Sequence, residues 1–490
     1  MVSVWSRREF LTAIAGCAAL PATAGAEEKY LLLDTRILER ERGARLTLGT
    51  VHKHPEPLFV EDKPWEPRFD NLYANVLYDE EEELYKCWYS PFIVDPVTSN
   101  TPREKRPEVK WHGGADLEMG ICYATSKDGI AWQKPELGLV EFQGSRRNNI
   151  VLRADPELGE QHGAGIAKDT REPDASRRYK MLFNCFNRRL PRSDPRCRYM
   201  CVGFSADGLN WSEFRPCPEI AAPGDTHSNW FWAPALRKYV GITRLFGDRQ
   251  RTQRLVARTE SPDFLHWSRA EVVLRALASE PNRQTYAMPA FPYAGVYLGL
   301  LMLINLNGRH DTVDCELAWS SDTVHWDRVC PGTPLIPRGP EGAHDSKCLF
   351  GAFHPIVRGD EIRLYYGGNN GEHGDFRDGF FCLARLRLDG FAAMEPEDSS
   401  VVAEITTRPL RCTGPHLRVN ADASNGVLGV AVMDEAGRRL SEAHPLRGDE
   451  LDGLVRWRHG QHLPKFIGRP VRLQFQLTRT RLYAFRFAER

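Results

Sequence analysis

The chain has 490 residues, of which 65 are basic and 65 acidic, so its formal net charge is zero. A balanced charge gives no reason to expect binding to nucleic acid or to an anionic membrane surface. The length exceeds that of one average domain, and 40 Gly, 33 Pro and 12 Trp residues are typical of many short strands joined by turns. The composition therefore predicts an all-β protein with one large and one smaller domain, and argues against a helical bundle.

The first 26 residues have the features of an export signal. The segment Ser6–Leu11, SRREFL, resembles a twin-arginine motif and overlaps an apolar run from Phe10 to Ala22. Small residues then provide two cleavage patterns, Ala22–Ala24 and Ala24–Ala26. The sequence predicts a twin-arginine signal peptide over residues 1–26 and export of the mature protein to the periplasm or the extracellular space.

A lipid anchor at Cys17 is an alternative fate for this segment, because Ile14–Cys17, IAGC, resembles a lipoprotein box. No other segment has the roughly 20 apolar residues of a membrane span, so no further membrane contact is expected.

Eleven cysteines remain besides Cys17, and most of them lie in apolar, strand-like runs, as Cys87, Cys122, Cys185 and Cys201 do. They form no CxxC pair and no zinc spacing, so a metal site is not predicted. Small buried side chains are the expected role. One or two disulfides are compatible with an exported protein, but the sequence does not give their pairing.

One short pattern recurs four times, with Ser, then Asp two residues later, then Trp four residues beyond the Asp. The copies are Ser126–Trp132, Ser205–Trp211, Ser261–Trp267 and Ser320–Trp326. An Asp at this place suits a tight turn, in which its carboxylate accepts backbone N–H bonds. The Trp residues are 79, 56 and 59 positions apart. A period of about 60 residues built from strands and turns predicts a β-propeller with four strands per blade.

Five segments have the pattern of a blade's innermost strand, and each is followed by a second apolar strand. They are Phe69–Tyr78, His162–Asp169, Asp225–Trp232, Thr285–Tyr293 and Asp345–Val357. Beyond Glu395 the composition shifts, and alternating strands separated by ordinary turns continue to the end of the chain. The sequence predicts a five-bladed β-propeller over residues 27–395 and a β-sandwich over residues 396–490.

The first residues of the inner strands would meet around the axis of such a propeller. These strand heads carry the following polar side chains: Asp70 and Asn71; His162; Asp225 and His227; Tyr286, preceded by Glu280; and His344 and Asp345. At any single position an Asp is typical of a turn or cap. An Asp at three of the heads favours a functional site instead. Crowded carboxylates repel one another and shift their pKa values, as they do in active sites. The pattern predicts a shared polar site at the mouth of the axis.

The chain resembles the five-bladed propeller glycoside hydrolases that include families 32 and 43, and most of all their divergent, exported family-32-like members. Five stretches carry the resemblance, which covers roughly residues 60 to 490: Asp225–Arg244, Ala257–Trp267, Tyr286–Leu301, His344–Phe350 with Gly359–Gly368, and Gly468–Leu477 with Leu482–Phe487. The chain lacks the NDPNG, RDP and EC signatures of invertases and has Gln284 where an acidic residue is expected. The resemblance thus implies the fold and a glycosidase site, but not a fructoside substrate.

The resemblance implies a site of three carboxylates. Carried over by position, Asp70 would be the nucleophile or base, and Asp225 would orient the sugar and tune pKa values. Glu280 would donate the proton, with Asp345 as the alternative donor.

Other residues would contact the sugar. The expected set is Asn71, His162, His227, Trp230, Tyr286 and His344, of which Trp230 and Tyr286 would stack on a sugar face. Packing in the core is an equally good account of the two aromatic residues. The loop Asn369–His373 is a further source of contacts, although it also reads as a plain glycine-rich loop.

The predicted function is therefore an exported glycoside hydrolase that acts on an oligo- or polysaccharide without a cofactor. A non-catalytic carbohydrate-binding propeller is one alternative, favoured by Gln284. A phosphorylase or a sialidase-like enzyme is another: the repeated turns resemble the sialidase Asp box, but no clear arginine triad is visible. A structural Ca²⁺ ion in the axial channel, which some related propellers hold, is left open.

Overall fold

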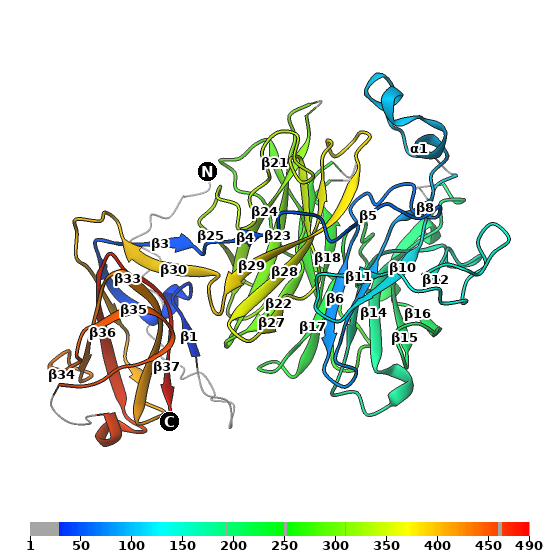
Figure 1. The fold of residues 1–490 in the computed structure, drawn as a ribbon. Helices are drawn as coiled ribbons and strands as arrows, with labels where there is room; N and C mark the ends of the chain where they lie inside the picture. The colour runs from blue at the N-terminus through cyan, green and yellow to red at the C-terminus, as the bar shows by residue number, and fades with distance from the viewer. Residues whose placement is uncertain are drawn as a thin grey trace, which may run out of the picture.

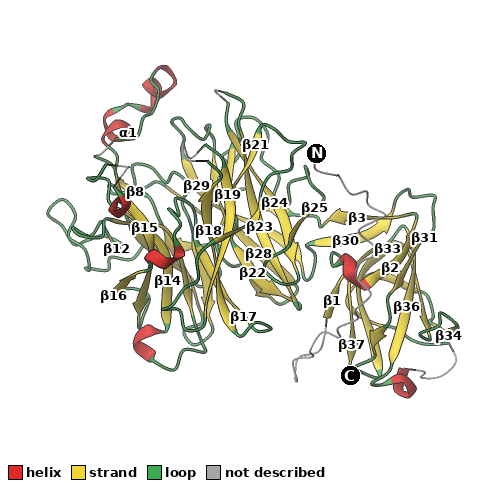
Figure 2. Ribbon diagram, turned by 180° about the vertical axis from the view of Figure 1, so that it is seen from behind, coloured by secondary structure: helices red, strands yellow, loops and turns green. Residues whose placement is uncertain are grey.

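The structure, a computed structural model, describes residues 29–489 apart from 115, 192–193, 249–251, 309 and 459–462. The predicted signal peptide and Cys17 lie outside these residues. Strands make up nearly all of the regular structure, as Figure 2 shows. The helices in the described part are α1 (Pro96–Asn100) and the short 3-10 turns η1 (Thr35–Ile37), η2 (Arg103–Glu108), η3 (Ala175–Arg177), η4 (Pro195–Cys197), η5 (Pro218–Ile220) and η6 (Leu463–Phe466). None of these helices is long and apolar enough to cross a membrane.

The larger body in Figure 1 is built from antiparallel sheet units that follow one another along the chain. Unit one consists of β6 (Asn75–Asp79), β7 (Leu84–Tyr89), β10 (Ile121–Ser126), β11 (Trp132–Gln133) and β12 (Ile150–Leu152). Unit two consists of β13 (Glu160–Lys168), β14 (Tyr179–Phe186), β15 (Arg198–Ser205) and β16 (Trp211–Pro216). Unit three consists of β17 (Asn229–Ala233), β18 (Lys238–Phe246), β19 (Arg254–Ser261) and β20 (Glu271–Leu274).

Two further units are joined by one parallel pair, Val313 with Cys348. Unit four consists of β21 (Arg283–Ala287), β22 (Ala290–Tyr293), β23 (Val296–Asn305), β24 (Thr312–Ser320) and β25 (Trp326–Val329). Unit five consists of β26 (Cys348–Gly351), β27 (Ile356–Arg358), β28 (Glu361–Asn369), β29 (Gly379–Arg387), β4 (His52–Lys53) and β5 (Phe59–Val60). A separate ribbon pairs β8 (Phe92–Val94) with β9 (Glu118–Met119).

Apolar faces of successive units pack against each other, and the last unit packs on the first. A pair of buried residues in one core cluster marks each junction: Trp88 with Phe183, Leu182 with Trp230, Ile242 with Leu301, Leu300 with Leu364, and Phe381 with Cys87. Strands buried on both faces need apolar side chains on both, which explains the continuous apolar runs of the second strands. The packing forms a nearly closed ring, in agreement with the predicted propeller architecture.

A segment from the beginning of the chain completes unit five. Strand β4 pairs with β29 through His52 and Arg385, and β5 pairs with it through Phe59 and Phe381. The last unit therefore takes its outer strands from residues that precede unit one. This connection ties the first unit to the last, because β5 is followed directly in the chain by the residues that lead into β6.

The four repeated turns have the geometry that the sequence predicted. In each copy the Asp Oδ1 accepts two backbone N–H bonds of 2.8 or 2.9 Å, from the residues two and three positions later. The Ser Oγ bonds the same carboxylate at 2.9 to 3.2 Å. Each turn joins the third strand of a unit to its outer strand or edge.

The smaller body in Figure 1 is an eleven-stranded sheet with a core of its own. Its strands are β1 (Lys29–Leu31), β2 (Leu38–Arg42), β3 (Ala44–Leu48), β30 (Ala392–Pro396), β31 (Ala403–Thr407), β32 (Leu410–Arg411), β33 (His416–Met433), β34 (Arg439–Glu442), β35 (Leu446–Leu454), β36 (Pro470–Thr478) and β37 (Arg481–Ala488). Strands β1, β2 and β3 pair with β37, β31 and β30. The boundary predicted at residue 27 therefore needs correction: residues 29–48 belong to this sheet, because their backbone groups pair there.

One disulfide, Cys185–Cys201, links the neighbouring strands β14 and β15. Most of the other described cysteines are buried, as expected for small apolar side chains.

Candidate active site

The heads of the first and third inner strands have unusual backbone conformations. Asp70, Leu72 and Tyr73 have φ values of 53°, 62° and 43°, and Asp225 has 48°. Residues with a Cβ rarely adopt this left-handed region, and such conformations concentrate at functional sites. Asp70 and Asp225, two of the three aspartates predicted to be catalytic, are therefore held in strained conformations by the surrounding structure.

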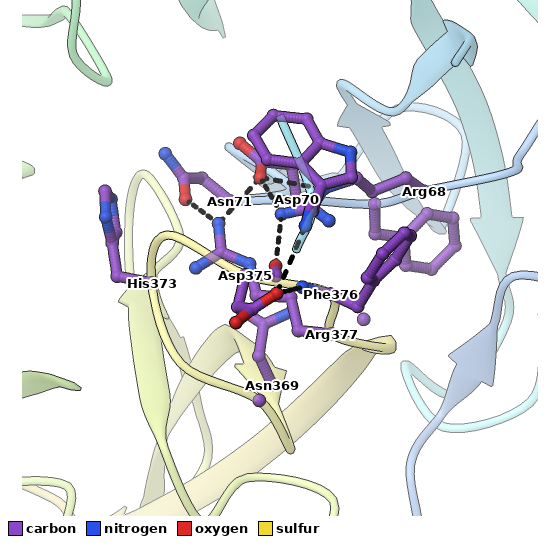
Figure 3. A network of polar contacts seen from close by, with 12 residues as sticks. Arg68, Asp70, Asn71, Asn369, His373, Asp375, Phe376 and Arg377 are labelled. Atoms are coloured by element: carbon purple, nitrogen blue, oxygen red, sulfur yellow. Dashed lines mark hydrogen bonds and ion pairs between the residues drawn. The ribbon is translucent and has the colours of Figure 1, made fainter. Parts of the chain in front are cut away.

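Asp70 lies between two arginines, as Figure 3 shows. Its Oδ1 is 2.7 Å from Arg377 Nη2 and 3.1 Å from Arg68 Nη2. Arg68 also donates to the backbone carbonyl of Asp375 and stacks over Trp111, 4.0 Å from the ring centre. Burial raises the pKa of Asp70, but the charges of Arg377 and Arg68 outweigh it and hold the pKa well below its usual range. Asp70 is a carboxylate at neutral pH, and 17% of its side chain is exposed.

Asp225 occupies an equivalent position on the third unit. Its Oδ2 is 2.7 Å from Arg198 Nη1 and 3.8 Å from Arg244 Nη1, and its Oδ1 is 3.4 Å from His162 Nε2. Burial raises the pKa of Asp225, yet the interaction with His162 and the charges of both arginines lower it well below its usual range. Its side chain is 30% exposed, so this carboxylate remains open to a ligand.

His162 reaches Asp225 because two strand heads approach each other closely at Gly163. A Cβ at Gly163 would lie 1.7 Å from the carbonyl oxygen of Thr226, and the glycine has a φ of 58°. Only glycine fits this contact. The sequence therefore needs glycine beside His162 to bring the second and third heads together.

A chain of hydrogen bonds runs from Asp70 to Tyr286, and Arg244 continues it to Asp225 by a cation–ring contact and an ion pair. Arg377 Nη2 donates to Asn71 Oδ1 at 2.7 Å, and Asn71 Nδ2 donates to Tyr286 Oη at 2.9 Å and to Tyr73 Oη at 2.8 Å. The Arg244 guanidinium lies 4.6 Å from the centre of the Tyr286 ring. Tyr286 of unit four thus lies between the Asp70 and Asp225 ends of the site.

His373 joins the site from the loop after β28, and Figure 3 shows it on the same loop as Arg377. His373 Nε2 lies 2.8 Å from Tyr286 Oη. Burial and the charge of Arg377 lower the pKa of His373 to about 3, so the ring is neutral at physiological pH. We call these residues the head cluster: Asp70, Asn71, Tyr73, His162, Asp225, Tyr286 and His373, with Arg68, Arg198, Arg244, Arg254 and Arg377.

Glu160 lies two residues before His162 on β13, on the same face of the strand. Its Oε1 accepts a 2.5 Å hydrogen bond from Arg188 Nε, while its buried Oε2 has no partner. Burial raises the pKa of Glu160 in spite of Arg188. Glu160 is therefore a carboxyl group beside the head cluster with an increased tendency to hold a proton.

The two acids predicted as proton donors are each paired with cations. Glu280 is ion-paired with Arg283 and Arg328, which also hold Glu316, and hydrogen bonds from Arg328 and Arg283 lower its pKa to about 2. Asp345 is buried, 2.6 Å from Lys53 Nζ, and accepts a 2.8 Å bond from Tyr366 Oη. Each carboxylate is thus paired with cations of its own sheet unit, and the role of either acid as proton donor stays a prediction.

Two of the predicted sugar contacts, Trp230 and His227, are buried, and a third, His344, is half-buried. Trp230 is buried against Phe264 and donates to the Gly165 carbonyl at 3.2 Å. His227 is 1% exposed, with Nε2 3.1 Å from Asn75 Oδ1. His344 is half-buried, with its ring 5.6 Å from that of Phe380. The sequence alone could not distinguish these residues from those of the head cluster, because both sets come from the same strand heads.

The predicted Asn71, His162 and Tyr286 do lie in the head cluster, whereas its arginines were missed. Arg198, Arg244 and Arg254 stand at or within second and third strands, where a lone arginine gives no signal in the sequence. Arg377 follows the Asn369–His373 loop, whose polar composition was the one available hint. Among the described residues, no group of three or more His, Cys, Asp or Glu side chains is placed to hold a metal ion.

No protein-family model and no curated protein matches the sequence. Several solved structures are similar in fold. A β-1,2-mannobiose phosphorylase from Listeria innocua matches with a TM-score of 0.48 and 13% identity, over 69% of this chain and 97% of the other. An N-acetylgalactosamine deacetylase from F. plautii, solved with blood group B trisaccharide, has a TM-score of 0.47 and 13% identity over 71% of this chain and 97% of the other.

A family-32 β-fructofuranosidase from Bombyx mori spans more of the chain, 89% of it and 94% of the other, with a TM-score of 0.41 and 11% identity. Other similar structures are also described as glycoside hydrolases. At this level of similarity they say nothing about which residues react, so the chemistry rests on the head cluster itself.

Proposed function

We propose that this protein is a glycoside hydrolase that cleaves an oligo- or polysaccharide at the head cluster. One observation carries the proposal: two partly exposed carboxylates, Asp70 and Asp225, are held ionised on separate strand heads around Tyr286. Glycosidic cleavage needs a carboxylate that acts as nucleophile or base and a second carboxyl group that protonates the leaving oxygen.

The exposure of the carboxylates suggests how the roles are divided. Asp225 is the more exposed of the two and is assigned the role of nucleophile or base. Asp70, held by two buried arginines, orients the sugar and Asn71. This reverses the roles expected from the resemblance, because 30% of the Asp225 side chain is exposed against 17% for Asp70.

Glu160 is assigned as the proton donor. Both aspartates are ionised, whereas the raised pKa of Glu160 favours its protonated form. Its position behind His162 requires the side chain to turn towards the substrate on binding, and active-site geometry commonly tightens in this way.

The test measures sugar release from a panel of glycans by the parent protein and two variants. Asp225→Asn and Glu160→Gln should each lower kcat by at least about a hundredfold, because each removes a group that acts in the transition state. Asp327→Asn, at an exposed position of β25, is the control and should leave turnover unchanged. Turnover that survives both substitutions would show that the reaction, if any, does not use these carboxyl groups.

A non-catalytic carbohydrate-binding protein is the second candidate, favoured by the ion pairs that neutralise both aspartates. Binding of a glycan without turnover in the parent protein, retained in Asp225→Asn, would support this candidate and contradict the first.

We also infer that the five sheet units are the blades of a five-bladed propeller and that the smaller body is a β-sandwich. The cyclic order of the core clusters supports the first inference, and the separate core of the eleven-stranded sheet supports the second.

Export by the twin-arginine route remains a proposal based on residues 1–26, with lipidation of Cys17 as its alternative. The mass of the mature protein distinguishes cleavage near Ala26 from a lipid-bearing N-terminus.

A further inference from the structure

The head cluster contains more positive charge than its two aspartates can neutralise. Five guanidinium groups belong to it, and among the described residues only the carboxylates of Asp70 and Asp225 lie within 4.0 Å of any of them. Five cations against two anions leave three positive charges. The excess is local, because the whole chain has no net charge.

Several of these arginines have buried N–H groups without an acceptor. The unpartnered atoms are Arg68 Nη1, Arg198 Nε, Arg244 Nε, Arg254 Nε, and Arg377 Nε and Nη1. Folded proteins pair nearly all buried donors, so a concentration of unpaired ones at a single site points to a missing acceptor. The donors are charged, which makes an anion the best acceptor.

Three of the arginines, Arg244, Arg254 and Arg377, converge on Tyr286 and His373. Arg244 and Arg254 lie 4.6 and 5.7 Å from the centre of the Tyr286 ring. Arg377 reaches the same tyrosine through Asn71. All three lie close enough to His373 for their charges to disfavour its protonated form.

Two of the three arginines, Arg244 and Arg254, also repel each other. Burial and the charge of Arg244 lower the pKa of Arg254. Arg254 itself bonds an uncharged acceptor, with Nη1 3.1 Å from Gln284 Oε1. Gln284 thus occupies the place at which an acidic residue would have neutralised Arg254. Like charges held together at such a cost are typical of a site that receives the opposite charge from outside.

We propose that Arg244, Arg254 and Arg377 form a binding site for an oxyanion. The fork of a guanidinium group matches carboxylate, sulfate and phosphate oxygens alike. Two sources share this chemistry: a carboxylate or sulfate group on the sugar that is cleaved, or free phosphate that acts as the attacking co-substrate. The first source rests on the proposed glycosidase function, whereas binding of the anion itself does not. The sequence gives no sign of this triad because its members come from β18, β19 and the loop after β28.

The first experiment measures anion binding by calorimetry, with sodium sulfate and sodium phosphate as probes in a chloride buffer of constant ionic strength. Arg254→Gln is the informative variant, because Arg254 has no carboxylate partner and its loss leaves no buried carboxylate unpaired. Binding should weaken by about tenfold or more, as expected for the loss of a charge-assisted bond. Arg254→Lys keeps the charge and should recover part of the affinity.

Arg147→Gln is the matched control, since the Arg147 side chain is 81% exposed and paired with Glu136. It should change anion affinity by less than about twofold. Circular dichroism and thermal unfolding establish that each variant is folded. Equal anion affinities for the parent protein and folded Arg254→Gln, or no measurable anion binding by the parent, would overturn the proposal.

A second experiment separates the two sources. Sugar release is compared for neutral, uronate-containing and sulfated glycans, each with and without phosphate. Selective turnover of acidic glycans that is lost in Arg254→Gln assigns the site to the substrate, and phosphate-dependent turnover assigns it to phosphate. Turnover of neutral glycans that is independent of phosphate and unaffected in Arg254→Gln contradicts the anion site but leaves the glycosidase intact. Anion binding by the parent protein without turnover of any glycan supports the anion site and contradicts the proposed glycosidase.

Discussion

At the scale of single residues, the energetics of the site depend on how Asp70 is paired. The side chains of Arg68 and Arg377 are each 1% exposed, so almost no water reaches their charges. Charges removed from water in this way are tolerated only with a partner close by. Asp70 is that partner for both arginines. Its replacement by a neutral residue removes one negative charge and leaves two buried positive charges without a partner.

Replacement of Asp70 by Asn should therefore destabilise the protein. The free energy of unfolding should fall by about 3 kcal/mol, the usual cost of a buried ion pair that loses one member. Unfolding in guanidinium chloride, followed by tryptophan fluorescence, measures this change. The double variant Asp70→Asn, Arg377→Met should recover part of the loss, because it removes one of the charges left without a partner. An Asp70→Asn protein as stable as the parent would show that water or another anion already neutralises these arginines.

At the scale of elements, the repeated turn shows what a short sequence pattern can predict. Ser, Asp and Trp are close together in the sequence, and the hydrogen bonds of the turn are made within that short stretch. Gly129 and Gly208 have left-handed backbone in two copies, with φ values of 75° and 77°. Phe264 and Thr323 take the same place in the other copies with φ values of 67° and 71°. The turn geometry is thus kept even where glycine is absent, because the Asp carboxylate holds the following backbone N–H groups.

The strands that close the ring, β4 and β5, cannot be predicted from a short sequence pattern. Strands β4 and β5 have two residues each, too short for any alternating pattern, and their partner lies in the last unit of the body. Side-chain packing rather than backbone pairing must hold such a segment. The Phe59 ring lies 4.5 Å from that of Phe381 and 5.1 Å from that of Tyr89, between the fifth and first units.

Phe59→Ala should open this junction. We expect a loss of about 2–3 kcal/mol in the free energy of unfolding, since a partly buried aromatic ring with several ring neighbours is removed. Val60→Ala is the control on the same strand, where the side chain is 39% exposed, and should cost less than about 0.5 kcal/mol. Chemical unfolding of both variants gives the comparison. Similar losses for the two would mean that the segment does not close the ring through Phe59.

At the scale of the whole molecule, much of the fold could be predicted from the sequence and less of the site. The order of the units follows from turns and apolar strands, which are local features. The pairing of strands within residues 29–60 with strands from the last part of the chain could not be predicted, because pairing between distant segments leaves no local pattern. The positions of Asp70, Asn71, His162, Asp225 and Tyr286 follow from being strand heads. The arginines could not be predicted, since a cation in a strand reads as an ordinary exposed residue until the surrounding units are in place.

The buried histidines give the molecule a predictable response to acid. Burial lowers the pKa of His227 to about 3, against 6.5 for an exposed histidine. A depressed pKa in the folded state contributes stability that is present above pH 6.5 and lost as the pH falls towards 3, because the unfolded chain takes up the proton first. Between pH 7 and pH 5 this group alone should lower the free energy of unfolding by roughly 2 kcal/mol. His373, with a pKa of about 3, acts in the same direction.

Chemical unfolding of the parent protein and of His227→Gln at several pH values between 7 and 5 measures this contribution. Glutamine can still donate to Asn75 Oδ1 but cannot gain a charge, so the dependence of stability on pH should become shallower by the share of one histidine. The slope is the informative quantity, because the substitution also changes packing against Tyr73 and Phe353 by an amount that does not vary with pH. His444→Gln, at an exposed position, should leave the slope as it is in the parent. An unchanged slope in His227→Gln would contradict this prediction. It would mean that His227 is protonated as easily in the folded chain as in the unfolded one, and that burial does not lower its pKa.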